Sequence, residues 1–292
     1  MRARTKSFLG IAGIVVLLAG ASVAAWALAP LFERVPLDEQ TQCPKNKPLT
    51  SHTVVLVDET DALSDTQARR LRALLDKTAG GLELYGRLTV LLLDSSNPYE
   101  PKRIFSMCAP KNPGSERALD GNQRLAKKRW DAAFGKPLDA AIDRLKRVPV
   151  SARSPIVESL KGVTWMPDFG PEIERRQLLI FSDLLQLSEG LSHYRGKPDY
   201  LRWKQSEHGQ QHRIKLRNVS VWVEYIERPQ TLKLQNSAHR QFWIQYFADT
   251  EASLVWDGQS PLPQSAPPSM HGTHPPQPSR QGLLSPSRQE QR

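Results

Sequence analysis

Cysteine is scarce in this sequence, with only Cys43 and Cys108 among 292 residues. The two form no CxxC pair and neither has a histidine beside it, which excludes the usual cysteine-based zinc motifs. Their state depends on the compartment, because disulfides persist in oxidising surroundings and thiols in reducing ones. A disulfide and two unpaired thiols are therefore both open from composition alone.

The sequence motifs of common enzyme classes are also missing. The chain contains no glycine-rich phosphate loop, no GxSxG and no HExxH, which are the usual signatures of nucleotide, ester and peptide chemistry. His208 and His212 are four residues apart and could share one helix face as metal ligands. Because the segment around them is polar and has no periodic apolar face, we interpret it as a solvated loop.

The excess of basic residues is small, at 40 Lys and Arg against 30 Asp and Glu. It favours contact with anionic surfaces but is weak support for nucleic acid binding. Two segments, LAKKRW and HYRGKPDYLRWK, mix bases with aromatics in a way that can grip single-stranded nucleic acid. We interpret both as solvated basic surface and expect no nucleic acid partner.

The longest apolar stretch covers residues 8–29, which include no charged side chain. At about 1.5 Å per residue it is long enough to cross a hydrocarbon core of roughly 30 Å. We interpret it as a transmembrane helix after a basic cytoplasmic segment, residues 1–7, with a cleaved signal peptide as the alternative. The bases before the stretch place the rest of this single-pass membrane protein in the periplasm or outside the cell.

An extracytoplasmic position gives the cysteines a role. Cys43 lies in a proline-containing linker, residues 30–51, and Cys108 lies in a polar segment, about residues 95–121, that is predicted to be a long loop. In an oxidising compartment a disulfide could tie the linker to the domain that follows it.

Residues 52–256 alternate between apolar strands and amphipathic helices. The predicted strands cover residues 54–57, 87–94, 178–181 and 218–229, and the predicted helices begin near residues 64, 138, 154 and 237. Continuously apolar strands are typical of a parallel sheet with helices on both faces, so we predict a doubly wound, Rossmann-like α/β domain with a mainly parallel sheet. Residues 194–217 are expected to be irregular. Residues 257–292, rich in Pro, Ser and Gln, are predicted to be disordered.

Polar side chains follow two of these strands directly. Asp58 and Thr60 come after VVLV, and Asp183 follows LLIFS. Because the carboxyl ends of parallel strands meet at one edge of a sheet, we expect these side chains at a common ligand-binding crevice. Carboxylate and hydroxyl oxygens suit Mg²⁺ or another hard divalent cation.

In this order, a strand with DxT, a serine-bearing turn before a helix, and a strand with SD resemble the von Willebrand factor A-like family. The resemblance implies a metal-ion-dependent adhesion site, in which a DxSxS motif, a Thr and an Asp on three loops hold Mg²⁺. Asp58 and Thr60 match the first two motif positions, whereas the third falls on Ala62, which has no oxygen to offer. Asp61, Glu59 or water would have to complete the ligand set.

The resemblance covers roughly residues 52–256 and assigns the other two loops as well. Ser154 is the best counterpart of the second-loop threonine, with Ser151 as the alternative. Asp183 matches the third-loop aspartate. The implied metal ligands are therefore Asp58, Thr60, Asp61, Ser154 and Asp183.

The two aspartates also have a metal-free interpretation. Asp58 can cap the turn after its strand, and Asp183 can cap a helix that begins at Leu184. Two carboxylates at one sheet edge repel each other unless they are paired, protonated or metal-bound, which favours a cation.

The function implied by the resemblance is a non-enzymatic, membrane-anchored interaction module of the bacterial envelope. An acidic side chain of an unidentified protein partner would complete the coordination of the cation. One alternative is a metal-assisted hydrolase that uses Asp58 and Asp183 as ligands and a bound water as nucleophile. A metal-free scaffold is the other alternative.

Overall fold

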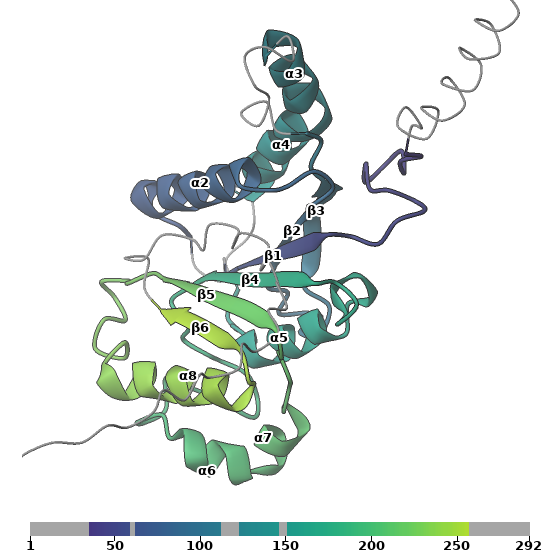
Figure 1. Ribbon diagram of the computed structural model, residues 1–292. Coiled ribbons are helices and arrows are strands. Elements are labelled where there is room, and N and C mark those ends of the chain that lie inside the picture. Colours follow the sequence, from purple (N-terminus) through teal and green to yellow (C-terminus); the bar gives the residue numbers. More distant parts are fainter. Residues whose placement is uncertain (1–34, 59–61, 112–122, 146–150, 257–292) are drawn as a thin grey trace, which may run out of the picture. The chain divides into compact units, whose positions relative to one another are not determined.

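The computed structural model describes residues 35–58, 62–111, 123–145 and 151–256 (Figure 1). The predicted transmembrane helix, the cytoplasmic segment before it and the predicted disordered tail lie outside these ranges. Within the four ranges, no helix combines the length and hydropathy that a membrane crossing requires.

A six-stranded sheet forms the centre of the domain, in the order β3-β2-β1-β4-β5-β6. All neighbouring strands run parallel except β2 and β3, which are antiparallel. The strands are β1 (Ser51–Val57), β2 (Arg87–Leu92), β3 (Lys102–Cys108), β4 (Arg175–Ser182), β5 (Val219–Tyr225) and β6 (Ser253–Trp256). This mainly parallel sheet confirms the predicted Rossmann-like α/β fold.

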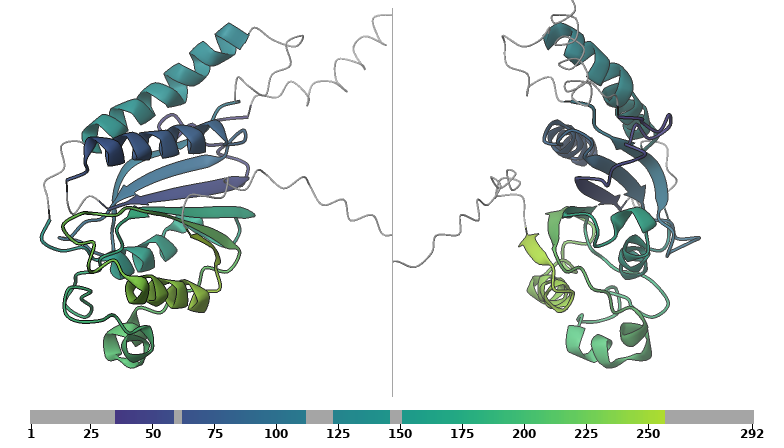
Figure 2. Two further views of the ribbon diagram at one scale, coloured as in Figure 1. Left: turned by 90° about the vertical axis from the view of Figure 1, so that its left-hand side faces the viewer. Right: turned by 45° about the vertical axis from the view of Figure 1, so that its right-hand side comes forward.

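Helices cover both faces of the sheet, with α2 and α4 on one face and α5 and α8 on the other (Figures 1 and 2). A π-helical turn, Asp131–Gly135, joins α3 to α4, and a short 3₁₀ helix, Pro167–Phe169, follows α5. The helices are α2 (Asp65–Gly80), α3 (Gln123–Trp130), α4 (Lys136–Leu145), α5 (Ile156–Thr164), α6 (Tyr200–Gln205), α7 (Glu207–Gln211) and α8 (Ser237–Asp249).

The apolar run in β1 reflects this two-sided covering. Val54 and Leu56 belong to the core formed with α5 and α8. Val55 and Val57 are equally buried and point to the opposite face, because successive strand side chains alternate. Each such side chain contributes about 1.5–3 kcal/mol through burial.

The polar segment at residues 95–121 is not entirely a loop, because Lys102–Cys108 forms the edge strand β3. Only Phe105 and Cys108 of this strand are buried. An edge strand has only one partner strand and tolerates polar residues, so Lys102, Arg103 and Ser106 interrupt its apolar residues and leave no long apolar run to signal it.

The prediction of irregular structure at residues 194–217 is wrong, because this segment contains α6 and α7. Each helix begins at a capping side chain: Asp199 accepts a hydrogen bond from Arg202 N at 3.1 Å, and Ser206 accepts one from Gly209 N at 3.1 Å. Helices of five or six residues are too short to display an apolar period, and their caps were the available signal.

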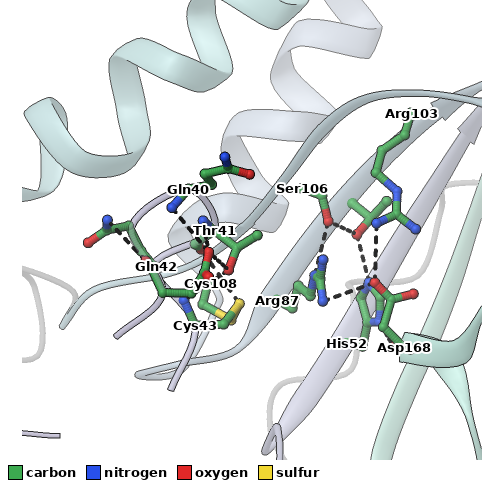
Figure 3. Close-up of a disulfide and its surroundings, with 12 residues drawn as sticks. Gln40, Thr41, Gln42, Cys43, His52, Arg87, Arg103, Ser106, Cys108 and Asp168 are labelled. Carbon is green, nitrogen blue, oxygen red and sulfur yellow. Dashed lines mark hydrogen bonds and ion pairs between the residues drawn. A yellow bond between two sulfur atoms is a disulfide. The ribbon is translucent and has the colours of Figure 1, made fainter. Parts of the chain in front are cut away.

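The two cysteines form a disulfide that joins the linker to the end of β3 (Figure 3). The backbone on both sides supports the contact, since Cys108 N donates a hydrogen bond to Thr41 O at 2.7 Å. Asp38 organises the same turn by accepting hydrogen bonds from Thr41 N and Thr41 Oγ1, at 2.8 and 2.9 Å. Of the two states left open by composition, the structure contains the disulfide.

Candidate functional site

The carboxyl edge of the sheet brings together four side chains, which we call the crest site: Asp58, Ser154, Ser182 and Asp183. Asp58 follows β1, and its backbone N–H donates to Phe181 O in the neighbouring strand β4 at 2.9 Å. This pairing sets Asp58 beside Ser182, the last residue of β4. The structure therefore confirms that the two strand ends present their polar residues at one place.

Asp58 is fully buried and is satisfied by serine hydroxyls. Its Oδ2 atom accepts hydrogen bonds from Ser182 Oγ at 2.7 Å and from Ser154 Oγ at 3.2 Å. Two hydroxyl donors on one carboxylate oxygen offset much of the free energy lost when the carboxylate leaves water. The result is a compact group of oxygen atoms contributed by β1, β4 and the segment before α5.

Ser154 reaches Asp58 from the segment before α5 and does not cap that helix. Helix α5 begins at Ile156 with Pro155 at its N-cap position. Ser154 instead forms a two-way backbone bridge with Leu187, at 3.0 and 2.9 Å, and this bridge directs its hydroxyl to the crest site. The alternative candidate, Ser151, is occupied by a hydrogen bond from the backbone N–H of Arg153.

Asp183 is buried and forms an ion pair with a buried arginine, Arg228. Asp183 Oδ2 accepts from Arg228 Nε at 2.6 Å, and Oδ1 accepts from Leu185 N at 2.9 Å. Arg228 also donates to the carbonyl of Ala62 through Nη1, at 3.4 Å. The guanidinium thus places a positive charge of the protein itself at this edge of the sheet.

Burial and the ion pair with Arg228 have opposite effects on the pKa of Asp183. Burial raises the pKa of Asp183 to about 6, and the negative charge of Asp58 adds to the rise. The hydrogen bond from Leu185 N and the ion pair with Arg228 act in the opposite direction. The crest site therefore contains two close carboxyl groups that need a counter-charge, and Arg228 supplies one.

The predicted helix from Leu184 does not form. Leu184 has a φ of 58°, in the left-handed region, and the chain turns there. Its carbonyl accepts hydrogen bonds from His239 Nε2 and Trp243 Nε1 of α8, both at 2.9 Å. These bonds and the burial of the Leu184 side chain maintain the strained backbone, so Asp183 caps a turn instead of a helix.

Thr60 and Asp61 lie outside the described residues, so their part in the site stays a prediction. Ser182 and Arg228 were not predicted. Ser182 could have been found from the SD pair, because a residue at the end of a strand lies on the same edge as the one after it. Arg228 follows β5 by three residues, and only the strand order shows that β5 lies next to β4.

The oxygen donors fit a hard divalent cation in part. Asp58, Ser154 and Ser182 offer the carboxylate and hydroxyl ligands that Mg²⁺ accepts. Asp183 is engaged by Arg228, so a cation that bound there would compete with the guanidinium.

The interpretation of residues 208–212 as a solvated loop is also wrong. His208 lies on α7 and His212 is the C-cap residue of that helix, and their rings stack with centroids 3.9 Å apart. Together with Glu158 of α5 they form a group whose candidate ligand atoms all lie within 4.8 Å of one another.

Comparison with known proteins returned no matching family model and no matching curated protein. Among solved structures, the chain is similar to an aerotolerance-related membrane protein from Bacteroides fragilis NCTC 9343, crystallised with multiple mutations to serines. The identity is 8%, the match covers 72% of this chain and 92% of that one, and the TM-score is 0.33. These values are too low for the likeness to support a family or a function.

Proposed function

We propose that this chain is a von Willebrand A-like interaction module of the bacterial envelope, anchored by a transmembrane helix at residues 8–29. In this proposal the crest site binds a divalent cation such as Mg²⁺, and an acidic side chain of a partner protein completes the coordination. The observation that carries the proposal is the convergence of Ser154 and Ser182 on Asp58 at the carboxyl edge of a parallel sheet.

Ser182 addresses the weakest point of the resemblance. The third position of the first-loop motif is Ala62, which offers no oxygen. Ser182, on the neighbouring strand β4, places a hydroxyl beside Asp58. This hydroxyl replaces the oxygen ligand that the motif position at Ala62 does not provide. Thr60 and Asp61 are proposed to complete the ligand set from the first loop.

The disulfide supports the proposed compartment. Disulfides persist in oxidising compartments such as the periplasm and the cell exterior. The Cys43–Cys108 bond therefore agrees with the orientation that the basic residues before the apolar stretch favour.

We expect Mg²⁺ or Mn²⁺ to bind the full chain in detergent with a measurable heat and to raise its melting temperature. Ser154→Ala should weaken binding by about tenfold, equivalent to about 1.4 kcal/mol, because it removes one hydroxyl ligand. Asp58→Ala should abolish binding. Asp76→Ala is the matched control, since Asp76 is an exposed carboxylate of α2 that forms an ion pair with Arg72 and lies outside the crest site.

Absence of both heat and thermal stabilisation in the wild-type chain would contradict cation binding and favour the metal-free interpretation, in which serine hydroxyls and Arg228 stabilise the crest carboxylates. For partner capture, we expect cross-linked pull-down from membranes to recover protein that is lost on addition of EDTA. Turnover of phosphoester or glycan substrates that requires both Asp58 and Asp183 would instead favour the metal-assisted hydrolase.

A further inference from the structure

A second group of polar side chains lies where α5 and α7 face each other. Glu158 is on α5, four residues after Ser154, while His208 is on α7 and His212 is the C-cap residue of α7. Glu158 and His212 are buried, while 19% of the His208 side chain is exposed, so the group borders solvent at one point. Buried histidines and carboxylates that face one another are a common basis of metal sites.

His212 is oriented as metal-bound histidines usually are. Its Nδ1–H donates to the backbone carbonyl of His208 at 2.7 Å, which leaves Nε2 as the atom with an available lone pair. Tyr99 OH donates to that Nε2 atom at 2.7 Å. A metal ion at Nε2 would therefore replace one hydroxyl hydrogen bond and keep the tautomer unchanged.

Glu158 is oriented in a comparable way. Gln186 Nε2 donates to Glu158 Oε2 at 2.9 Å, while Glu158 Oε1 accepts from His208 Nε2 at 3.1 Å. Gln186 is itself fixed, because its Oε1 accepts from Val157 N at 2.9 Å. Glu158 Oε2 thus has a protein partner in Gln186, and Oε1 faces the imidazole of His208.

Close backbone packing fixes the position of these side chains. A Cβ atom at Gly190 would lie 1.9 Å from His208 Cδ2, so only glycine lets the chain pass over that ring. A Cβ atom at Gly162 would lie 2.0 Å from Tyr99 O, so glycine also lets the Tyr99 segment approach α5. The cluster is therefore held from several directions, as a preorganised ligand set requires.

We propose that Glu158, His208 and His212 form a Zn²⁺ site, with Glu158 Oε1 and the two Nε2 atoms as ligands. Two imidazoles and one carboxylate are a ligand set that zinc accepts in three-ligand sites, where water takes the fourth position. Tyr99 OH, which contacts His212 Nε2 at 2.7 Å in the metal-free protein, would be the nearest hydroxyl to a metal bound at that atom. The inference is independent of the proposed function, because none of these residues belongs to the crest site.

One contact must change when zinc binds. Trp203 Nε1–H donates to His208 Nδ1 at 3.0 Å, so His208 carries its proton on Nε2 in the metal-free protein. Coordination at Nε2 moves the proton to Nδ1, where it faces the indole N–H of Trp203. The Trp203 hydrogen bond therefore stabilises the metal-free tautomer of His208, and its removal should increase zinc affinity.

The test is a zinc titration of the full chain in detergent, by competition with a chromophoric chelator. His271→Ala and His274→Ala are included in every variant, because these two tail histidines offer an unrelated zinc ligand pair. With excess Mg²⁺ present to occupy the crest site, we expect one Zn²⁺ per chain in this background.

Variants of the cluster should change zinc affinity in opposite directions. His212→Ala and Glu158→Gln should weaken binding by about 10- to 100-fold or more, since even outer partners of zinc ligands have effects of that size. Trp203→Phe should strengthen it by about tenfold, because no buried N–H then opposes the metal-bound tautomer. Glu172→Gln, at an exposed glutamate, is the matched control.

Tighter zinc binding in Trp203→Phe, with a circular dichroism spectrum that matches the parent, is the opposite of what loss of the preorganised cluster would cause, so this variant keeps the test decisive even if the others are unstable. Equal affinity in Trp203→Phe and the parent, or binding that survives His212→Ala, would overturn the zinc site and leave a hydrogen-bonded structural cluster. Asp58→Ala should bind zinc normally, which separates this result from the outcome at the crest site.

Discussion

Replacement of Arg228 by glutamine is expected to lower the free energy of unfolding by about 1–3 kcal/mol at pH 7, because it leaves the carboxyl group of Asp183 buried without its counter-charge and makes it take up a proton. Both partners of this ion pair are almost fully enclosed, with side-chain exposures of 6% and 3%. Equilibrium unfolding in urea measures the loss directly. Addition of Mg²⁺ or Mn²⁺ should restore part of it if a cation can take the place of the guanidinium.

The pH dependence of this loss identifies its origin. The pKa of Asp183 in the folded chain is about 6, above the ordinary value of 3.8, so its contribution to stability is present below pH 3.8 and is lost as the pH rises through 6. Arg228→Gln removes a group that opposes the rise, so the pKa of Asp183 increases further. The destabilisation should therefore shrink between pH 7 and pH 5.

Two controls accompany this experiment. Arg240→Gln removes an exposed arginine that pairs with Glu227 and should cost less than about 1 kcal/mol. Arg228→Gln combined with Asp183→Asn removes both charges and should recover a large part of the loss. The same loss at pH 5 and pH 7, or no recovery in the double variant, would show that Arg228 stabilises the fold through packing and not through Asp183.

Removal of the disulfide is the second large effect, with an expected loss of about 2–4 kcal/mol in the free energy of unfolding. The bond joins residues 65 positions apart, and closing a long loop restricts the unfolded chain strongly. Cys43→Ala with Cys108→Ala is the preferred variant, because both positions are buried and a serine hydroxyl would need a partner there.

Unfolding in guanidinium chloride, with and without a phosphine reductant, measures this effect. The wild-type chain should lose stability on reduction, whereas the alanine variant should be unaffected by the reductant. If native protein reacts at both cysteines with a thiol reagent before any reduction, the bond is not formed in the purified chain and the prediction is wrong.

The fold was predictable because the apolar runs and helix caps in the sequence coincide with strands and helices of the α/β domain. VVLV in β1 is apolar on both faces because helices cover both faces of the sheet. The α2 helix begins where Ser64 and Gln67 form a capping box, which is visible in the sequence. Edge strand β3 has no long apolar run because it is only partly buried, and helices α6 and α7 are too short to show an apolar period, so only their capping residues indicated them.

The crest site was predictable only as far as its residues follow predicted strands. Asp58 and Asp183 were identified because each ends an apolar run. Arg228 could not be identified in this way, because its contact with Asp183 joins residues 45 positions apart through the strand order. The zinc candidate was missed because Glu158 and the histidines meet only through the packing of α7 against α5, and residues 208–212 have no apolar face to indicate a helix.

The disulfide also determines how tension enters the domain. A pull on the chain before Cys43 reaches two strands at once: through residues 44–50 it loads β1 at the centre of the sheet, and through the sulfur atoms it loads β3 at the edge. The β2–β3 hydrogen bonds therefore share a load that would otherwise fall on β1 alone. Because Asp58 directly follows β1, the covalent bond shields the crest site from forces applied at the amino-terminal side of the domain.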